Sequence, residues 1–131
     1  MRSADGLMVA SVRGEQYLTK TEQYKLVYNE GKTRVSGLVV IKALTNGLGF
    51  SRCGFSVSRR VGNAVVRNRV KRLLREISRL TSLQPGWDIV FIARSPAAGA
   101  KYIDLEKSIK SLLHKALLLA EDYESVSSEV N

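Results

Sequence analysis

The chain has 131 residues, of which 25% are charged and 44% hydrophobic, and this suits one globular domain with a single core. Its net charge of +9 is concentrated, because residues 52–79 hold nine Lys and Arg and a single acid, Glu76, while the rest is nearly neutral. The single cysteine excludes a disulfide framework and a cysteine-based zinc site, and no apolar run suits a signal sequence or a membrane span.

We therefore expect a cytoplasmic protein with a local basic surface of the kind that binds nucleic acid. No internal repeat or domain boundary interrupts the sequence, so residues 1–131 are predicted to be one domain. Residues 1–16 mix Gly, Ser and scattered charges without periodicity, which predicts a flexible arm. The acidic and polar residues 121–131 predict a tail that frays.

A first helix is predicted over residues 21–30, begun by a capping box at Thr19 or an N-cap at Thr21. Tyr24 and Tyr28 are four residues apart on this helix, so their rings share one face. From the residues alone, packing of both rings in the core and stacking of both rings on unpaired bases are equally good interpretations.

The next segment predicts strands. A strand is expected over residues 35–44, and the Asn46-Gly47 turn predicts a hairpin to a second strand over residues 49–58. In the second strand apolar residues alternate with small or polar ones, which include Arg52 and Ser56. One face of that strand is therefore bare of bulky side chains, and it is either exposed to solvent or covered by a ligand.

The strongest pattern is a predicted helix over residues 63–80. Asn63 is a good N-cap, and at 100° per residue one face is apolar, formed by Val66, Val70, Leu73, Leu74, Ile77 and Leu80. The opposite face carries Arg67, Asn68, Lys71, Arg72, Arg75 and Arg79. Like charges four residues apart repel each other, and a bound polyanion would relieve that repulsion. A solvated helix face is the alternative interpretation, but solvated faces usually mix charges of both signs.

The last elements are a buried central strand over residues 87–94 and a Leu-rich helix over residues 103–119. The element order is α-β-β-α-β-α, with room for one more short strand within residues 33–58, and this predicts an α+β sandwich. No pair of acids, nucleophile or Gly-rich loop suggests catalysis, and the lone His114 is interpreted as structural. The side chains available are those that bind phosphates and bases.

Several segments resemble one known family. The predicted helix reads Gly62-Asn63-Ala64-Val65-x-Arg67-Asn68-Arg69-x-Lys71-Arg72-x-x-Arg75, and this is similar to the signature of the bacterial ribonuclease P protein component. The first helix, with Tyr24, Tyr28 and Gly31, and the strands at residues 54–60 and 88–94 resemble the same family. The resemblance covers roughly residues 17–118 and rests on a specific motif of fourteen positions.

The resemblance implies a single-domain α-β sandwich, with a four-stranded sheet and a left-handed βαβ crossover around the signature helix. It also implies that the chain is the protein subunit of a ribonucleoprotein endonuclease, a hydrolase that removes the 5′ leader from precursor tRNA. In that family the RNA subunit, with Mg²⁺ bound chiefly by the RNA, is the catalyst, and the protein alone is not catalytic. The implied partners are the ribonuclease P RNA and precursor tRNA, with one protein per RNA.

Carried over by position, the resemblance implies two groups of site residues and no catalytic or metal-binding residue. The contacts to the catalytic RNA would be Arg59, Arg60, Arg67, Asn68, Lys71, Arg72 and Arg75. The cleft for the leader would be lined by Tyr24, Tyr28, Lys42, Arg52 and Ser56. Lys42 stands where the family places an aromatic residue, which predicts a grip on the leader that is more electrostatic and less dependent on stacking.

Two other functions compete with this interpretation. The first is a ribosomal or other structural RNA-binding protein with a similar βαβ element. The second is a protein-only nuclease, for which the purified chain would cleave RNA without an RNA subunit. Activation of a ribonuclease P RNA by the protein would distinguish a ribonuclease P subunit from both alternatives.

Overall fold

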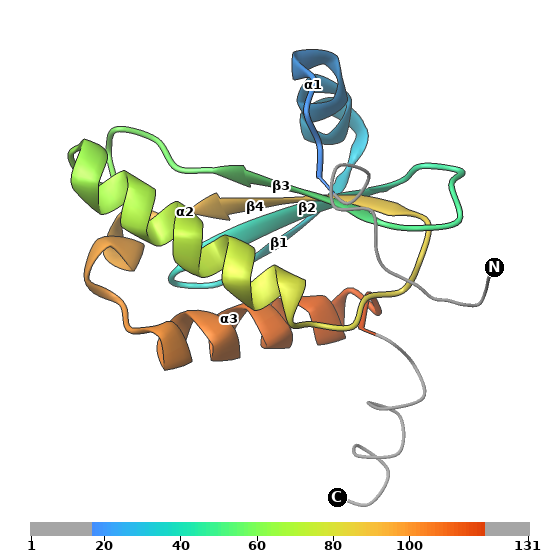
Figure 1. The fold of residues 1–131 in the computed structure, drawn as a ribbon. Helices are drawn as coiled ribbons and strands as arrows, with labels where there is room; N and C mark the ends of the chain where they lie inside the picture. Colours follow the sequence, from blue (N-terminus) through green and yellow to red (C-terminus); the bar gives the residue numbers. More distant parts are fainter. Residues whose placement is uncertain (1–16, 120–131) are drawn as a thin grey trace, which may run out of the picture.

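The computed structural model describes residues 17–119, which form a four-stranded sheet with α1 on one face and α2 and α3 on the other (Figure 1). The elements in chain order are α1 (Thr21–Glu30), β1 (Lys32–Val35), β2 (Val39–Thr45), β3 (Arg52–Ser56), α2 (Ala64–Arg79), β4 (Trp87–Ala93), the 3-10 helix η3 (Ser95–Gly99) and α3 (Tyr102–Lys115). The predicted α+β class and the four-stranded sheet are confirmed. The predicted arm and tail lie outside the described residues.

The strand order is β1-β2-β4-β3, with β4 antiparallel to β2 and parallel to β3. The prediction that Asn46-Gly47 closes a hairpin between β2 and β3 is therefore wrong, because β4 lies between these strands. The preference for β4 has a physical reason: Ile89, Val90 and Phe91 are fully buried, so this strand has apolar side chains on both faces and belongs in the centre.

The predicted strand over residues 35–44 is two strands. A turn at Ser36 and Gly37 separates β1 from β2, and these two strands form the actual hairpin, with Val35 opposite Val40. The hydroxyl of Ser36 accepts hydrogen bonds from the backbone N–H groups of Leu38 and Val39, at 3.4 and 3.1 Å, which stabilises the turn. The extra short strand expected in this region is confirmed.

The helix ends follow local chemistry. Asn63 caps α2 as predicted, since its side-chain oxygen accepts the N–H of Val66 at 3.0 Å. The predicted caps of α1 are wrong: the cap residue is Lys20, and the side chain of Gln23 accepts its N–H at 3.0 Å. At the other end of the chain, α3 stops at Lys115 rather than at residue 119, because Leu117 takes a left-handed conformation with φ of 61°.

The crossover from β3 through α2 to β4 is left-handed. The side chains of Ile89, Phe91 and Ala93 point to the face that carries α2, while the N–H of Arg94 donates to the C=O of Leu38 beside β2. Along a strand, the backbone N–H and C=O groups of successive residues point to alternate sides, and for L-residues the direction of the side chain determines which side. The side chain of Arg94 points away from α2, and its N–H points to β2. With β4 pointing up and viewed from the α2 side, β2 therefore lies to the left and β3 to the right. The chain therefore crosses from right to left, against the usual right-handed rule.

The sheet has a hydrophobic core on each face. The larger core lies between the sheet and the helices α2 and α3, with Phe91, Leu74 and Ile109 at its centre. The smaller core lies under α1, where Val27 packs with Leu18 and Val90. Since α1 covers only part of its face, the rest of that face is open beside it (Figure 1). Within residues 17–119, no helix combines the length and the apolar character that crossing a membrane requires.

A buried carboxylate fixes the loop between β2 and β3. Asp88 on β4 accepts two hydrogen bonds from Arg52, at 2.9 and 2.8 Å, and one from the side-chain amide of Asn46 at 2.9 Å. The same amide of Asn46 donates to the C=O of Phe50 at 3.2 Å, so both ends of the loop are tied to one carboxylate. Fork-shaped pairing of this kind is a strong, directional contact.

We expect Asp88→Ala to lower the free energy of unfolding by about 3 kcal/mol, at the low end for a broken buried pair, because the Arg52 side chain is 20% exposed. Chemical denaturation with a fluorescence or circular dichroism readout measures this change. The control is Glu76→Gln, which breaks the exposed ion pair with Arg79 and should not shift the unfolding midpoint. Equal stability of Asp88→Ala and the wild type would show that this network does not hold the loop.

Candidate nucleic-acid interface

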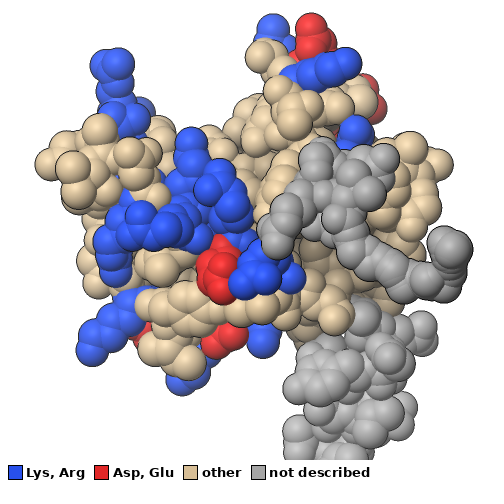
Figure 2. Space-filling view, in the orientation of Figure 1, with Lys and Arg blue, Asp and Glu red and all other residues tan. Residues whose placement is uncertain are grey.

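The orientation of α2 directs its basic residues outward. Val70, Leu74 and Ile77 are at most 1% exposed and pack against the sheet, while the opposite side of the helix faces solvent. Figure 2 shows the lysines and arginines gathered over this helix. We call the following residues the cationic face: Arg59, Arg60, Arg67, Asn68, Lys71, Arg72 and Arg75. Burial of the apolar side thus brings the five predicted RNA contacts within α2, from Arg67 to Arg75, to the opposite side of the helix.

The residues of the cationic face differ in their exposure to solvent and in their contacts within the protein. Arg59, Arg60, Asn68, Arg72 and Arg75 are exposed. Arg67 is half-buried, and its Nε donates to the C=O of Gly62 at 3.1 Å, so one edge of its guanidinium holds the turn before α2. Lys71 is half-buried as well. Most of the cationic groups are therefore available to phosphate oxygens.

Two further basic residues of α2, besides Arg67, have partners within the protein. Arg79 pairs with Glu76 at 2.8 Å, and its hydrogen bonds lower the pKa of the Glu76 carboxyl. Arg69 projects from the other side of the helix, where its guanidinium donates to the C=O groups of Ala98 and Ala100 at 3.4 and 3.0 Å. Arg69 thus fastens α2 to η3. The single acid of residues 52–79 neutralises Arg79 and leaves the cationic face uncompensated.

The two tyrosines of α1 have different environments. Tyr24 is half-buried above Gly54, and its hydroxyl accepts the N–H of Phe55 at 3.3 Å. Burial raises the pKa of Tyr24, and the hydrogen bond from Phe55 opposes that shift. Tyr28 is 37% exposed, with its ring centroid 6.4 Å from that of Tyr24. Tyr24 therefore supports α1 on the sheet, while Tyr28 offers a ring to solvent.

Lys42 and Ser56 lie on the sheet face that carries α1. In the strand register Lys42 is opposite Val90 and Ser56 is opposite Ile92, and both partners pack in the smaller core. The ammonium of Lys42 donates to the C=O of Tyr28 at 3.5 Å, close to the C-terminal end of α1 where a positive charge is favourable. The structure thus brings Lys42 close to the predicted tyrosine pair.

Arg52 shares this sheet face but is engaged differently. Its bidentate pairing with Asp88 raises the pKa of its guanidinium and orients that group toward the carboxylate. The structure therefore shows a structural partner for Arg52, a role that the sequence did not indicate. The carboxylate is 36 residues away along the chain, and only the pairing of β3 with β4 reveals it.

Phe55 has a role in the site that its place in the sequence did not predict. Its ring stacks on Phe91 with centroids 5.8 Å apart, and the guanidinium of Arg75 lies 5.7 Å from its ring centre. Its backbone N–H donates the hydrogen bond that the Tyr24 hydroxyl accepts. Phe55 therefore touches both helices that carry predicted site residues. The available signal was its position within the bare-faced strand, next to Gly54 and Ser56.

The surface between the two groups is concave. Figure 2 shows a hollow between α1 and the cations that lie over α2. Within the part of the chain that the structure describes, no three His, Cys, Asp or Glu side chains lie together in a way that could hold a metal ion. Burial raises the pKa of the Cys53 thiol to about 12, so this cysteine is not a nucleophile at neutral pH. The arrangement is suited to binding an anionic, partly unpaired polymer.

Comparison with known proteins gives one consistent match. The family model for ribonuclease P matches residues 12–117. A ribonuclease P protein component from Dehalococcoides mccartyi is 49% identical over 114 residues, which cover 87% of this chain and 95% of that protein. One from Caldanaerobacter subterraneus is 46% identical over 106 residues, which cover 79% of this chain and 91% of the relative.

Solved structures agree with the sequence matches. The RNase P protein from Thermotoga maritima superposes with a TM-score of 0.70 at 30% identity, covering 76% of this chain and 96% of that one. A mutant of the Staphylococcus aureus RNase P protein, described as defective in mRNA degradation activity, superposes with a TM-score of 0.76 at 26% identity, covering 82% and 92% of the two chains. The predicted family and fold are therefore confirmed.

We expect Gly54→Ala to destabilise the protein by about 1–3 kcal/mol, because an added Cβ would lie 2.7 Å from the ring and hydroxyl of Tyr24. Thermal unfolding measures the change. Gly37→Ala is the matched control, since a Cβ there meets nothing within 4 Å and should change the free energy of unfolding by less than about 0.5 kcal/mol. If the two variants melt at the same temperature, the close packing of Tyr24 on β3 is not what supports α1.

Proposed function

The chain belongs to the family of ribonuclease P protein components, which take part in tRNA processing within an endoribonuclease holoenzyme, and on this premise we propose how it acts. The cationic face binds the catalytic RNA subunit, and the hollow beside α1 binds the 5′ leader of precursor tRNA. The protein thereby assists Mg²⁺-dependent endonucleolytic removal of the leader, in the cytoplasm and with one protein per RNA. The protein alone is not catalytic.

The observation that carries the proposal is the uncompensated charge on the exposed side of α2. The one acid in this region is paired with Arg79, and Arg69 is turned toward η3, so the remaining cations share no acidic partner among residues 17–119. Folded RNA presents closely spaced phosphates that such a surface neutralises. The fork geometry of arginine suits phosphate oxygens, and Asn68 can both donate to and accept from a base edge or a 2′-hydroxyl.

The proposed leader site combines an aromatic ring that can stack on a base with polar groups that can contact the backbone of the leader. Tyr28 offers an exposed ring for a base, while the Lys42 ammonium and the Ser56 hydroxyl offer polar contacts on the sheet face beside it. Arg52 lies on the same sheet face, but its pairing with Asp88 limits it to supporting the site. Only the precursor has unpaired leader nucleotides, so this site distinguishes precursor from mature tRNA.

The chemistry of cleavage is proposed to reside in the RNA subunit with its Mg²⁺ ions, which would supply charge stabilisation and an activated water. The donor set of the described residues fits this division, since they provide no cluster of carboxylates or imidazoles for a metal ion. The contribution of the protein is to hold both RNAs and to reduce the repulsion between them. That contribution needs arginines, lysines, one amide and exposed rings.

We expect assembly with a ribonuclease P RNA to weaken steeply with salt. With about six cations on phosphates, the plot of log binding constant against log salt concentration should have a slope of roughly −4 to −6. Arg72→Ala, which removes one exposed cation, should reduce the magnitude of the slope by about 0.7–0.9. Filter binding over a range of salt concentrations measures both values.

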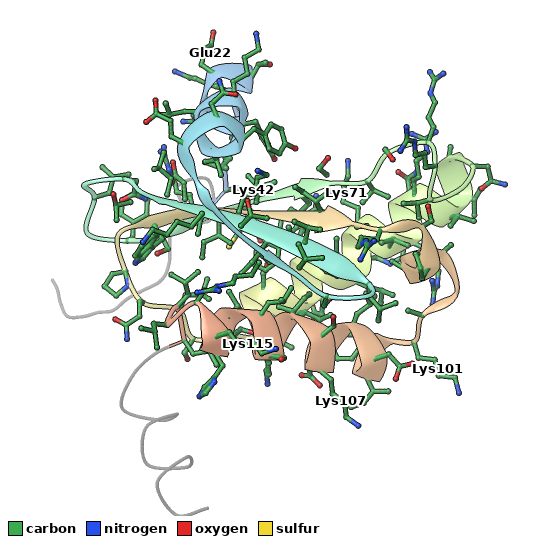
Figure 3. The ribbon with its side chains drawn as sticks, turned by 180° about the vertical axis from the view of Figure 1, so that it is seen from behind. Glu22, Lys42, Lys71, Lys101, Lys107 and Lys115 are labelled. Atoms are coloured by element: carbon green, nitrogen blue, oxygen red, sulfur yellow. The ribbon has the colours of Figure 1, made fainter. Side chains whose placement is uncertain are left out.

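The matched control for the salt experiment is Lys115→Ala, which removes one positive charge from α3 on the side of the sheet away from α1 (Figure 3). It should leave the slope at the wild-type value. A wild-type slope near zero, or equal effects of the two substitutions, would contradict the assignment of the catalytic RNA to the cationic face.

We expect Tyr28→Ala to weaken binding of precursor tRNA to the holoenzyme by about 1–3 kcal/mol, because one stacked base would be lost. Binding of mature tRNA should not change, since it lacks the leader. Tyr28→Phe is the control, because it retains the ring and removes only the hydroxyl. Parallel titrations of the two tRNAs measure the difference, and equal losses for both tRNAs would show that Tyr28 does not contact the leader.

A further inference from the structure

The cationic face is not uniform, and Arg75 differs from its neighbours. Its guanidinium lies at the β3 edge of the sheet, 5.7 Å from the ring centre of Phe55. Arg72, which is also exposed, makes no hydrogen bond or ion pair within residues 17–119 and projects away from the sheet. Two arginines three residues apart on one helix therefore face different surroundings.

Phe55 connects Arg75 to the other helix. The Arg75 guanidinium makes a cation–π contact with the ring of Phe55. The backbone N–H of Phe55 donates to the hydroxyl of Tyr24 at 3.3 Å. Arg75 is close enough to Tyr24 that its charge contributes to the pKa of that hydroxyl, although burial has the larger effect and raises it. Tyr24 in turn packs 6.4 Å from the exposed ring of Tyr28. Arg75 is thus linked to the tyrosine pair through a single intervening residue, Phe55.

We infer that Arg75 contacts the leader of precursor tRNA rather than the catalytic RNA, and that it binds the phosphate next to the nucleotide stacked at Tyr28. The inference rests on the proposed function, since it divides the proposed RNA-binding surface between two RNAs. Arg75 from α2 and Tyr24 from α1 both contact Phe55, so Arg75 would border the hollow opposite α1, and Phe55 is the residue that positions it.

The chemistry of the cluster suits one phosphate. A guanidinium is planar, and one that lies over an aromatic ring can still donate from its outer N–H groups to two phosphate oxygens. The ring of Phe55 limits the freedom of the Arg75 side chain, so less entropy is lost on binding. Lysine at this position would retain the charge but lose the planar stacking and the bidentate geometry.

Lys71 extends the same border of the hollow. It lies one helical turn before Arg75 and is half-buried, whereas Arg72 is exposed. Figure 3 shows Lys42 on the side of the sheet that carries α1 and Lys71 at the level of the strands, while Lys101, Lys107 and Lys115 lie along α3 on the other side. The hollow is therefore bordered by positive groups from α2 and from β2, with the rings of α1 between them.

The test compares Arg75→Ala with Arg72→Ala, which removes the same side chain from the outward side of the helix. Holoenzyme is assembled at saturating protein, and the ratio of the affinities for precursor and mature tRNA is measured. We expect Arg75→Ala to lower this ratio about tenfold, as the loss of a charged hydrogen bond implies. Arg72→Ala should keep the wild-type ratio and instead require more protein to assemble with the RNA subunit.

Two further variants keep the test decisive if Arg75→Ala affects folding. Arg75→Lys retains the charge and should lower the ratio by a smaller factor, and Phe55→Leu retains an apolar side chain on Phe91 but removes the ring beneath the guanidinium. Both should lower the ratio, with unchanged melting temperature for Arg75→Lys. Equal ratios for Arg75→Ala, Arg72→Ala and the wild type would overturn the inference. A wild-type ratio near one would instead contradict the proposed leader site itself.

Discussion

The packing of one side of α2 against β3 and α3 is the interaction on which the rest of the structure depends. Val70, Leu74 and Ile77 are essentially inaccessible to water, and each such side chain contributes about 1.5–3 kcal/mol when buried. Repulsion between like charges on the opposite side costs only a few tenths of a kcal/mol per pair. The apolar side therefore determines the orientation of the helix, and the cations must face outward whatever their mutual repulsion.

Because of the strand order, α1 and α2 both contact the same edge strand, β3. Because β3 is an edge strand, its outer backbone groups are accessible: Cys53 accepts the N–H of Leu18 at 2.9 Å, and Phe55 donates to the hydroxyl of Tyr24. The N-terminal side of α1 is thus fixed to the same strand that Arg75, near the C-terminal end of α2, contacts through the Phe55 ring. An edge strand covered in this way is protected from pairing with other chains. The hollow between the two helices follows from this shared strand rather than from a loop.

Local chemistry made the helices predictable, and long-range pairing made the sheet unpredictable. The Asn63 cap and the periodic burial in α2 depend on residues within a turn or two, and they appear as expected. The pairing of β3 with β4 depends on which strand is most apolar on both faces, and the strong local turn signal at Asn46-Gly47 does not reveal it. A local rule was overridden by the burial of a distant strand.

The same distinction applies to the site. The sequence identified which residues are cationic, but not which of them have partners. Arg52 is paired with Asp88, and Arg69 with carbonyl groups of η3, through contacts that exist only in the folded chain. The role of Phe55 was hidden for the same reason, since its neighbours Arg75 and Tyr24 come from two different helices.

Reconstitution of precursor tRNA cleavage at low Mg²⁺ concentration tests whether the protein acts by helping a catalytic RNA. The purified protein, a ribonuclease P RNA, and the two together are compared in single-turnover reactions. We expect that the protein alone cleaves nothing, that the RNA alone is slow because phosphate repulsion is poorly screened, and that the mixture cleaves rapidly at the leader junction. Cleavage by the protein alone, or no acceleration of the RNA by the protein, would contradict this expectation.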